Sequence, residues 1–277
     1  MKVNILGINV DGLTEEQALE KIDSFLQQEK QHFIITANSE FLLKCWADQK
    51  LTEIVNQADL VTADGIGLLW AAKFLKKPLK SFLWSLWQAY FTAILLMFKR
   101  KNYHSIIPQR ITGIDLMEKM CKLAAANNQS LYLLGADRGV AEKTAEILQK
   151  NYPDLKIAGT DQGPPNLNKA TAEELTEMTD KIKMVNPDIL LVAFGQPKQE
   201  LWINQNLEKL PSVKVAMGVG GAFDFIGGKA KRAPALYQEL GLEWLWRFLH
   251  EPQRAVRIFN ATFKFMYTVV KLKHRFN

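Results

Sequence analysis

Two apolar, β-leaning stretches in the first quarter of the chain end in side chains that can do acid–base chemistry. The stretch at residues 60–63 is followed by Asp64, and the stretch at residues 32–37 ends in Thr36 and Asn38. An acid in the turn after a strand lies beyond the carboxyl end of that strand, where open α/β sheets bind ligands and carry out chemistry. We therefore predict that the two strand ends face one crevice and that Asp64 is its catalytic acid or base. These residue types also favour turns and helix N-caps, so a purely structural role stays open.

Three further predicted strands end in glycine. A glycine lets the backbone approach a phosphate closely, and the N-terminus of the following helix favours an anion. Three such ends on one side of a sheet indicate a nucleotide or sugar-phosphate ligand, although each glycine alone is equally compatible with a tight turn. The glycines of the last strand lack the spacing of a dinucleotide fingerprint, and nothing resembles a phosphate-binding loop that ends in Gly-Lys-Ser/Thr. The candidate nucleotide-sugar-binding residues at these ends are Gly135, Ala136, Gly195, Gln196, Gln199, Gly218, Gly220, Gly221 and Asp224.

The C-terminal segment supplies the candidate cations Arg247, Arg254 and Arg257. Arg254 and Arg257 are three residues apart, so on a helix they share one face, and two forked guanidinium groups suit a diphosphate. Farther along, large apolar residues repeat at helical spacing and predict a basic amphipathic helix that can lie on an anionic bilayer. An ordinary packing helix with a charged outer face is the alternative. The apolar residues of this stripe are Phe259, Phe263, Met266 and Val270.

Strands that alternate with helices of 10–15 residues must position these side chains. This alternation predicts an α/β fold with a doubly wound, mostly parallel, Rossmann-like sheet. It continues to about residue 225, so we expect a catalytic domain over residues 1–225 and a helical, basic, membrane-docking appendage over residues 226–277. The expected strands lie at residues 2–8, 32–37, 60–63, 130–135, 156–160, 188–195 and 213–219.

The composition narrows the class of protein further. The chain has 277 residues, of which 48% are hydrophobic, enough for a sizeable core. Its only cysteines, Cys45 and Cys121, give no disulfide framework and no zinc spacing, and the N-terminus does not read as a signal peptide. We therefore expect a protein of the reducing cytoplasm. The net charge of +6 is concentrated in the C-terminal tail and suggests nucleic acid, an anionic membrane or a phosphorylated substrate as partner.

Residues 82–98 form a stretch of 17 residues without a charge. This is the lower limit for a membrane span of roughly 17–25 residues. We reject a span, because one crossing would put Asp64 and the strands after residue 130 on opposite sides of the bilayer. Both flanks are also basic, which removes any positive-inside asymmetry. We expect an apolar insertion over residues 82–103 that faces the membrane or a protein partner, a homo-oligomer included; burial within the monomer is the alternative.

Together these motifs resemble the WecG/TagA/CpsF family of bacterial glycosyltransferases. Each motif is short, but they occur in the order found in the family over about residues 2–260. The sequence departs from the family at about residues 82–103, which are longer and more apolar than is usual there. The matching pieces lie at residues 36–38, 63–65, 110–115, 134–135, 194–200, 218–224, 232–234, 241–244 and 251–254.

The resemblance implies transfer of a sugar, commonly an aminosugar such as N-acetylmannosamine, from a UDP-sugar to a polyprenyl-diphosphate-linked sugar. Such products feed wall teichoic acid, enterobacterial common antigen or capsule synthesis. It also implies an inverting reaction without a metal. No cofactor is expected, because the UDP-sugar is itself a substrate. The enzyme would lie on the inner face of the cell membrane, with the appendage helping to complete the site.

The family chemistry fits the candidate residues. Asp64 would be the base that takes the proton of the acceptor hydroxyl, and Thr36 and Asn38 would orient the acceptor or the departing group. Gln196 and Asp224 would hold the nucleotide. The negative charge on the leaving UDP requires cations, and the candidates are Arg247, Arg254 and Arg257.

Two other functions compete with this interpretation. A nucleotide-dependent oxidoreductase would need a Gly-x-Gly-x-x-Gly turn after its first strand, and residues 7–12 do not supply one. A non-catalytic, basic membrane- or nucleic-acid-binding protein would leave Asp64 and the three glycine-bearing strand ends without a role. We therefore expect an enzyme, with no nucleic-acid partner.

Overall fold

The computed structural model describes residues 1–98, 106–239, 243–250 and 255–275. Its centre is a six-stranded sheet in which every neighbouring pair of strands is parallel. The strands are β3 (His32–Ala37), β4 (Leu60–Ala63), β5 (Ser130–Gly135), β6 (Lys156–Asp161), β7 (Ile189–Ala193) and β8 (Val215–Gly218). Their order across the sheet is β4-β3-β8-β7-β5-β6, which confirms the predicted parallel α/β sheet.

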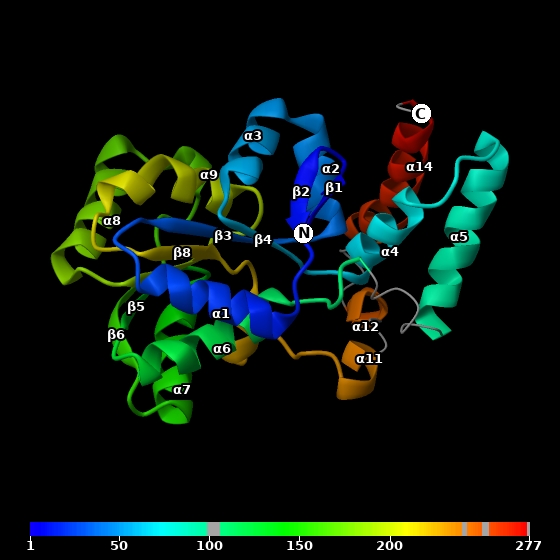
Figure 1. Ribbon diagram of the computed structural model, residues 1–277. Coiled ribbons are helices and arrows are strands. Elements are labelled where there is room, and N and C mark those ends of the chain that lie inside the picture. The colour runs from blue at the N-terminus through cyan, green and yellow to red at the C-terminus, as the bar shows by residue number, and fades with distance from the viewer. Residues whose placement is uncertain (99–105, 240–242, 251–254, 276–277) are drawn as a thin grey trace.

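Helices cover both faces of the sheet (Figure 1). The strands read as almost continuous apolar runs because their side chains point alternately into two buried layers. Phe33 and Ile35 belong to one core cluster, whereas Ile34 belongs to the other. One layer is formed by α2 (Ser39–Ala47), α3 (Gln49–Gln57), α8 (Ala172–Val185) and α9 (Lys198–Asn206). The other is formed by α1 (Glu15–Leu26), α6 (Gly113–Ala126), α7 (Val140–Asn151) and α10 (Ala222–Ile226).

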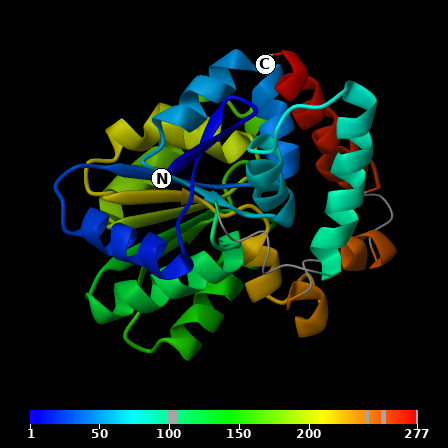
Figure 2. The same ribbon diagram turned by 45° about the vertical axis from the view of Figure 1, so that its right-hand side comes forward.

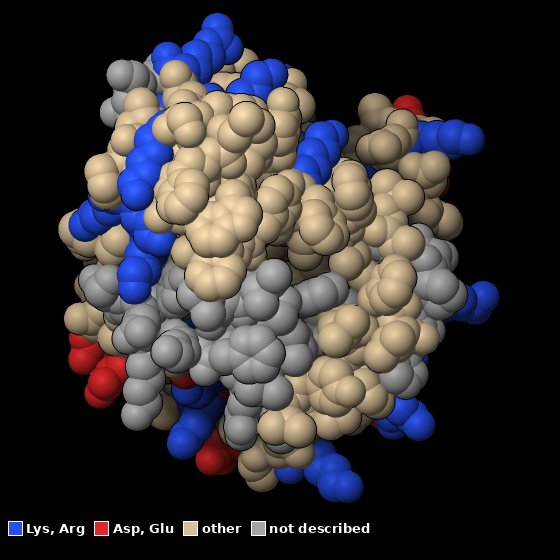
Figure 3. Space-filling model, turned by 90° about the vertical axis from the view of Figure 1, so that its right-hand side faces the viewer, with Lys and Arg blue, Asp and Glu red and all other residues tan. Residues whose placement is uncertain are grey.

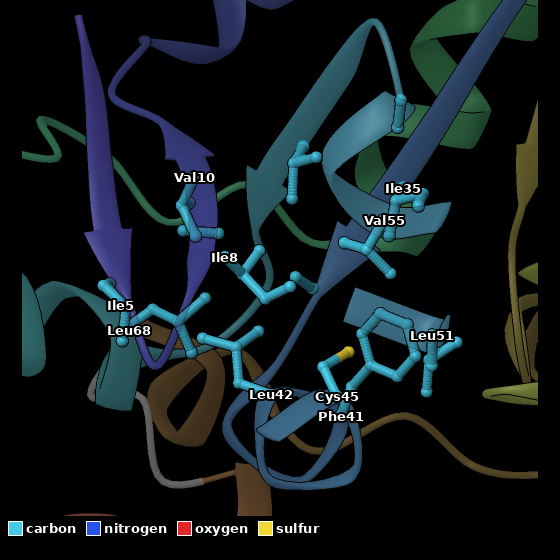
Figure 4. Packing of buried hydrophobic residues seen from close by; sticks show 14 of the residues in the cluster. Ile5, Ile8, Val10, Ile35, Phe41, Leu42, Cys45, Leu51, Val55 and Leu68 are labelled. Atoms are coloured by element: carbon cyan, nitrogen blue, oxygen red, sulfur yellow. The ribbon is translucent and has the colours of Figure 1, made fainter. Parts of the chain in front are cut away.

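The N-terminus forms a β-hairpin, so the prediction of one strand over residues 2–8 was wrong. Strands β1 (Lys2–Ile5) and β2 (Ile8–Asp11) pair antiparallel. Leu6 and Gly7 both have positive φ angles, 52° and 86°, as a tight two-residue hairpin turn requires. Figure 4 shows Ile5, Ile8 and Val10 in the apolar cluster that also contains Leu42 and Leu68. The hairpin thereby closes the core beside β4.

The C-terminal region is helical, as expected, but its last helix belongs partly to the core. It consists of α11 (Ala235–Glu239), α12 (Glu243–His250), α13 (Ala255–Phe259), the π-helical turn η5 (Asn260–Lys264) and α14 (Phe265–Arg275). Val270 is fully buried, whereas Phe259 and Phe263 are exposed. The predicted stripe is therefore not one face, because the π-helical turn between its ends breaks the 3.6-residue spacing that the prediction assumed.

Helix α14 packs against α4 (Ile66–Leu75), which follows Asp64, and against α5 (Phe82–Phe98). Figure 2 shows α5 at the outer edge of the molecule, in front of α14. Within the described ranges, no helix combines the length and the apolar character that a crossing of the bilayer needs.

Lys273 fastens α14 to the end of α4. Its side chain is buried, and its Nζ donates to the carbonyl oxygen of Phe74 at 2.8 Å and also to that of Lys77. These carbonyls belong to the last turn of α4 and to the residues just after it, where few backbone N–H groups are available as donors. Burial, reinforced by the nearby charge of Lys77, lowers the pKa of Lys273 below its ordinary value.

We expect Lys273→Met to lower the free energy of unfolding by about 1–3 kcal/mol, because the carbonyl oxygens of Phe74 and Lys77 lose the hydrogen bonds from the lysine Nζ. Urea unfolding of the two proteins measures this difference. The control is Lys271→Met, because Lys271 lies on the same helix and is exposed. Equal effects of the two substitutions would contradict the role of Lys273.

Candidate active site at the carboxyl edge of the sheet

The candidate residues gather at one edge of the sheet because all six strands run in the same direction. Asn38 follows β3 and Asp64 follows β4, at the next position across the sheet. Gln196 follows β7, and Gly218 is the last residue of β8, which lies between β3 and β7. The predicted crevice-facing strand ends are thus neighbours in space, although residues 38 and 196 are 158 positions apart in the chain.

The side-chain amide of Gln196 is hydrogen-bonded both to the side chain of Asn38 and to the backbone of Thr36. Asn38 Nδ2 donates to Gln196 Oε1 at 3.0 Å, and Gln196 Nε2 donates to the backbone oxygen of Thr36 at 2.8 Å. Asn38 Oδ1 accepts the backbone N–H of Phe41 at 2.9 Å and so caps α2. Asn38 is therefore an N-cap, as the structural alternative held, and the same side chain also contacts the β7 end of the crevice.

Asp64 and Thr36 meet around the first residue of α6. The backbone N–H of Gly113 donates to Asp64 Oδ2 at 3.3 Å. A Cβ atom added at Gly113 would lie 3.1 Å from Thr36 Oγ1 and 3.7 Å from Asp64 Oδ2. The missing side chain therefore lets the helix N-terminus approach both residues. The positive end of the helix dipole stabilises negative charge on the Asp64 carboxylate.

Gln199 holds the ends of β7 and β8 together. Its Oε1 accepts the backbone N–H groups of Gly195 and Gly220, each at 3.0 Å, and its Nε2 donates to Glu200 Oε1 at 2.9 Å. A Cβ atom at Gly218 would lie only 2.4 Å from Gln199 Nε2, so this arrangement requires glycine there. In this conformation, the backbone N–H groups of Gly195 and Gly220 are therefore hydrogen-bonded within the protein.

The remaining strand-end candidates flank this centre. Gly135 and Ala136 have left-handed φ angles of 104° and 69°, and the Ala136 N–H donates to the oxygen of Ala193 at 3.2 Å. Gly221 precedes α10, and a Cβ atom there would lie 3.7 Å from Asp224 Oδ2. These residues line the part of the same edge formed by β5 and β8.

Arg257 reaches the first turn of α2. Its Nε donates to both carboxylate oxygens of Glu40, at 3.2 and 3.0 Å, and Glu40 lies two residues after Asn38. The side chain of Arg247, on α12, and the whole of Arg254 lie outside the described part of the chain.

Two arginines that were not predicted as site residues lie near the N-terminus of α6. Arg232 Nη2 is 2.7 Å from Asp115 Oδ1, in the first turn of that helix. Arg110 Nη1 donates to Glu243 Oε2 at 2.8 Å, and Glu243 begins α12. Both arginines belong to stretches that carried the family resemblance, so that resemblance could have identified them as site residues.

Glu200 and Lys44 were also missed. Lys44 Nζ donates to the backbone oxygen of Gln196 at 3.2 Å, so it supports the crevice from α2. Burial raises the pKa of the Glu200 carboxyl to about 7, against the opposing effect of the hydrogen bond from Gln199. Among the residues that the structure describes, no three His, Cys, Asp or Glu side chains form a group that could hold a metal ion.

Comparison with known proteins gives one consistent result. A model of the Glycosyl transferase WecG/TagA/CpsF family matches residues 3–85 and 92–277, so the middle of α5 lies outside the match. Similar curated proteins are named N-acetylglucosaminyldiphosphoundecaprenol N-acetyl-beta-D-mannosaminyltransferase. Those from Staphylococcus aureus strains MRSA252, MW2 and NCTC 8325 / PS 47 are each 33% identical over 276 residues, covering 99% of this chain and 94% of the relative.

The buried carboxyl of Glu200 makes stability depend on pH. Its pKa is about 7 in the folded protein against 4.5 ordinarily, so the folded state holds a proton that the unfolded state releases. Stability therefore falls as the pH rises from 4.5 to 7, by up to roughly 3 kcal/mol from this group. In Glu200→Gln we expect this fall to disappear.

Urea unfolding at a series of pH values from 5 to 8 tests this expectation. Glu208→Gln removes an exposed carboxyl close by and serves as control. If the free energy of unfolding changes with pH in the wild type as it does in Glu200→Gln, then Glu200 is already ionised in the folded protein.

Proposed function

The chain belongs to the glycosyl transferase WecG/TagA/CpsF family and is a glycosyltransferase, and we propose that it transfers N-acetylmannosamine from a UDP-sugar to undecaprenyl-diphosphate-linked N-acetylglucosamine. The names of the similar curated proteins support both sugars and the lipid. Such a transfer is a step in the synthesis of wall teichoic acid or a related cell-surface polysaccharide. Family membership overturns the alternatives of an oxidoreductase and a non-catalytic binding protein.

The observation that carries the proposal is the meeting of Asp64 and Thr36 at Gly113, beside the linked amides of Asn38 and Gln196. Asp64 is only partly buried, so an acceptor hydroxyl can reach its carboxylate. The partly exposed amides of Asn38 and Gln196 have further donor and acceptor capacity for sugar hydroxyls, and Thr36 is buried behind them. Such a constellation combines a base with groups that orient two sugars.

In the proposed reaction the acceptor oxygen attacks C1 of the donor sugar from the face opposite UDP. A bond forms between C1 and the acceptor oxygen while the bond from C1 to the UDP phosphate oxygen breaks, so the configuration inverts. Asp64 takes the hydroxyl proton as the new bond forms. The hydrogen bond from Gly113 N–H at the start of α6 holds the carboxylate in place for that step.

The departing UDP gains negative charge, and guanidinium groups balance it in the proposed mechanism without a metal ion. Arg257 is suited to this because its partner Glu40 holds it beside the first turn of α2, close to Asn38. Arg232 pairs with Asp115 in the first turn of α6, and Arg110 lies three residues before that helix. The UDP-sugar is a substrate, so the proposed reaction needs no separate cofactor.

The proposed acceptor is a lipid, so the reaction takes place at a membrane surface. We place the enzyme on the inner face of the cell membrane, as a peripheral protein, because UDP-sugars are cytoplasmic metabolites. The basic C-terminal helices support contact with an anionic surface.

We expect Asp64→Asn to reduce kcat by roughly 10²–10⁴-fold, because the amide cannot accept the hydroxyl proton. The assay is UDP release from a panel of UDP-sugars in EDTA, with and without a short-chain polyprenyl-diphosphate-N-acetylglucosamine acceptor. Asp154→Asn changes an exposed aspartate in a turn and serves as control. Acceptor-dependent release should be greatest with UDP-N-acetylmannosamine and should survive EDTA.

Unchanged release by Asp64→Asn would remove Asp64 from the role of base while keeping the enzyme class. Release only with another donor would change the proposed sugar. Loss of activity in EDTA that added Mg²⁺ restores would contradict the metal-independent mechanism.

The role of Arg257 gives a separate prediction. We expect Arg257→Gln to lower kcat by roughly a hundredfold with a small change in KM for the donor, because the charge that it balances develops as UDP departs. Lys264→Gln removes an exposed charge from the same region and should leave kcat unchanged. A rise in KM alone would assign Arg257 to ground-state binding of the donor.

A further inference from the structure

Several large apolar side chains of helix α5 face outward instead of packing against the protein. Its side toward the protein carries the small residues Ser85, Ala89 and Thr92, which are at most 6% exposed, with the partly buried Phe82 and Leu86 beside them. Its outer side carries large apolar residues: Leu83 is 79% exposed and Trp87 is 54% exposed. Surface helices of globular proteins bury their apolar stripe and expose polar residues, which is the reverse. Close packing through small residues, with the large apolar groups outside, is typical of helices that face lipid.

The inward side of α5 is fixed by specific polar contacts. Trp70 Nε1 on α4 donates to Thr92 Oγ1 at 3.0 Å, and His274 Nε2 on α14 lies 3.0 Å from Ser85 Oγ. The outer rings of Trp84, Trp87 and Phe91 form a row with neighbouring ring centroids 5.0 Å apart. The orientation of α5 is therefore set by the protein, which keeps the large rings outside.

The exposed apolar surface continues onto the C-terminal region. Tyr90 on α5 contacts the ring of Phe263 at a centroid distance of 5.9 Å, and Phe263 stacks on Phe259 at 5.6 Å. We call this surface the aromatic face; its exposed members are Leu83, Trp84, Trp87, Phe91, Phe259 and Phe263. Figure 3 shows this side of the molecule as mainly uncharged, with Lys and Arg around it and few acidic residues.

The charges of the segments that bear the aromatic face all have one sign. Between Asp64 and Asp115 the sequence has eight Lys and Arg and no acid, and after Glu251 it has six and no acid. The whole chain has 35 Lys and Arg against 29 Asp and Glu, so the rest of the chain has 21 against 29. The excess positive charge of the sequence therefore lies in the segments that bear the aromatic face. Lys80, whose Nζ lies 5.1 Å from the ring centroid of Trp84, joins the two features.

We propose that the aromatic face docks on an anionic phospholipid bilayer and that α5 is the element that inserts its rings among the acyl chains. This deepens the proposed function, since it rests on a lipid-linked acceptor and names the surface that meets the lipid. The rings of Trp84 and Trp87 would lie at the level of the headgroups, where tryptophan is enriched in membrane proteins. The surrounding lysines would contact phosphate groups, each contributing to binding through the negative surface potential.

A bilayer fits this face better than a second copy of the chain. Two copies joined through the aromatic face would bring exposed lysines such as Lys80, which lies over the Trp84 ring, and Lys264, next to Phe263, toward one another. The segments that bear the face have no acid to offset this repulsion. An anionic bilayer offers both an apolar layer for the rings and opposite charge for the lysines. The apolar character and the charge of this face therefore both favour an anionic bilayer as its partner.

The test is co-sedimentation of the full-length protein with vesicles of phosphatidylcholine alone and of phosphatidylcholine rich in phosphatidylglycerol. We expect the wild type to bind only the anionic vesicles. Trp84→Ala/Trp87→Ala/Phe91→Ala should weaken this binding by roughly tenfold or more, because three exposed rings no longer leave water. Lys76→Gln/Lys80→Gln should weaken it by roughly thirtyfold.

The matched control is Met184→Ala/Val185→Ala. These residues form an exposed apolar pair on α8, which Figure 1 shows at the opposite end of the molecule from α5. This variant should bind anionic vesicles like the wild type. Its thermal unfolding, and that of the triple ring variant, should also match the wild type, since only exposed groups change.

Three results would overturn the inference. The first is a ring variant that binds anionic vesicles as tightly as the wild type does. The second is a wild type that binds neutral vesicles as well as anionic ones. In the third, the wild type would form a dimer that the ring variant dissolves, which would assign the face to a second copy. Vesicle binding needs no substrate, so it tests docking separately from transfer. A wild type that docks but transfers no sugar from any donor would refute the proposed function and leave the docking inference standing.

Discussion

The hydrogen bond from Asn38 to Gln196 joins two strands that are not neighbours, and the candidate site depends on it. β3 and β7 lie on either side of β8, so the bond passes over the end of β8. β8 ends in Gly218, whose missing side chain leaves the space that the Gln199 side chain occupies. Gln199 then holds the β7 and β8 ends together through Gly195 and Gly220. Three amide side chains thus fix three strand ends against one another, and one glycine leaves room for the third of them.

The doubly wound topology explains why Asp64 is held from both sides. Helix α4 continues from Asp64 on one face of the sheet, whereas α6 starts beside it and packs on the other face. The chain changes faces between these helices, and the N-terminus of α6 therefore points at the carboxylate of the preceding strand end. Gly113 permits the approach, since a side chain there would crowd Thr36. The acid, the hydroxyl and a helix N-terminus come together as a result of strand order.

Local sequence pattern was sufficient for most strands and for the edge at which the site lies. The apolar runs at β3, β4 and β5 begin and end where they were predicted, because both faces of the sheet are covered. The role of Gln199 was not predictable from the pattern, since it joins Gly195 to Gly220 across a strand order that sequence does not display. The inward side of α5 was also hidden: the stretch carries no charge, so periodicity alone could not tell its small side from its aromatic side.

The aromatic face and the candidate site share helix α4. It begins just after Asp64, and α5 runs back along it, since Thr92 in the third turn of α5 contacts Trp70 in the second turn of α4. The ten residues of α4 span about 15 Å, so a bilayer on the aromatic face would lie beside the site. A polyprenyl diphosphate is anchored at the headgroup level by its chain and moves only along the surface. An enzyme that brings its base to that level lets the lipid acceptor enter sideways, while the soluble donor arrives from water.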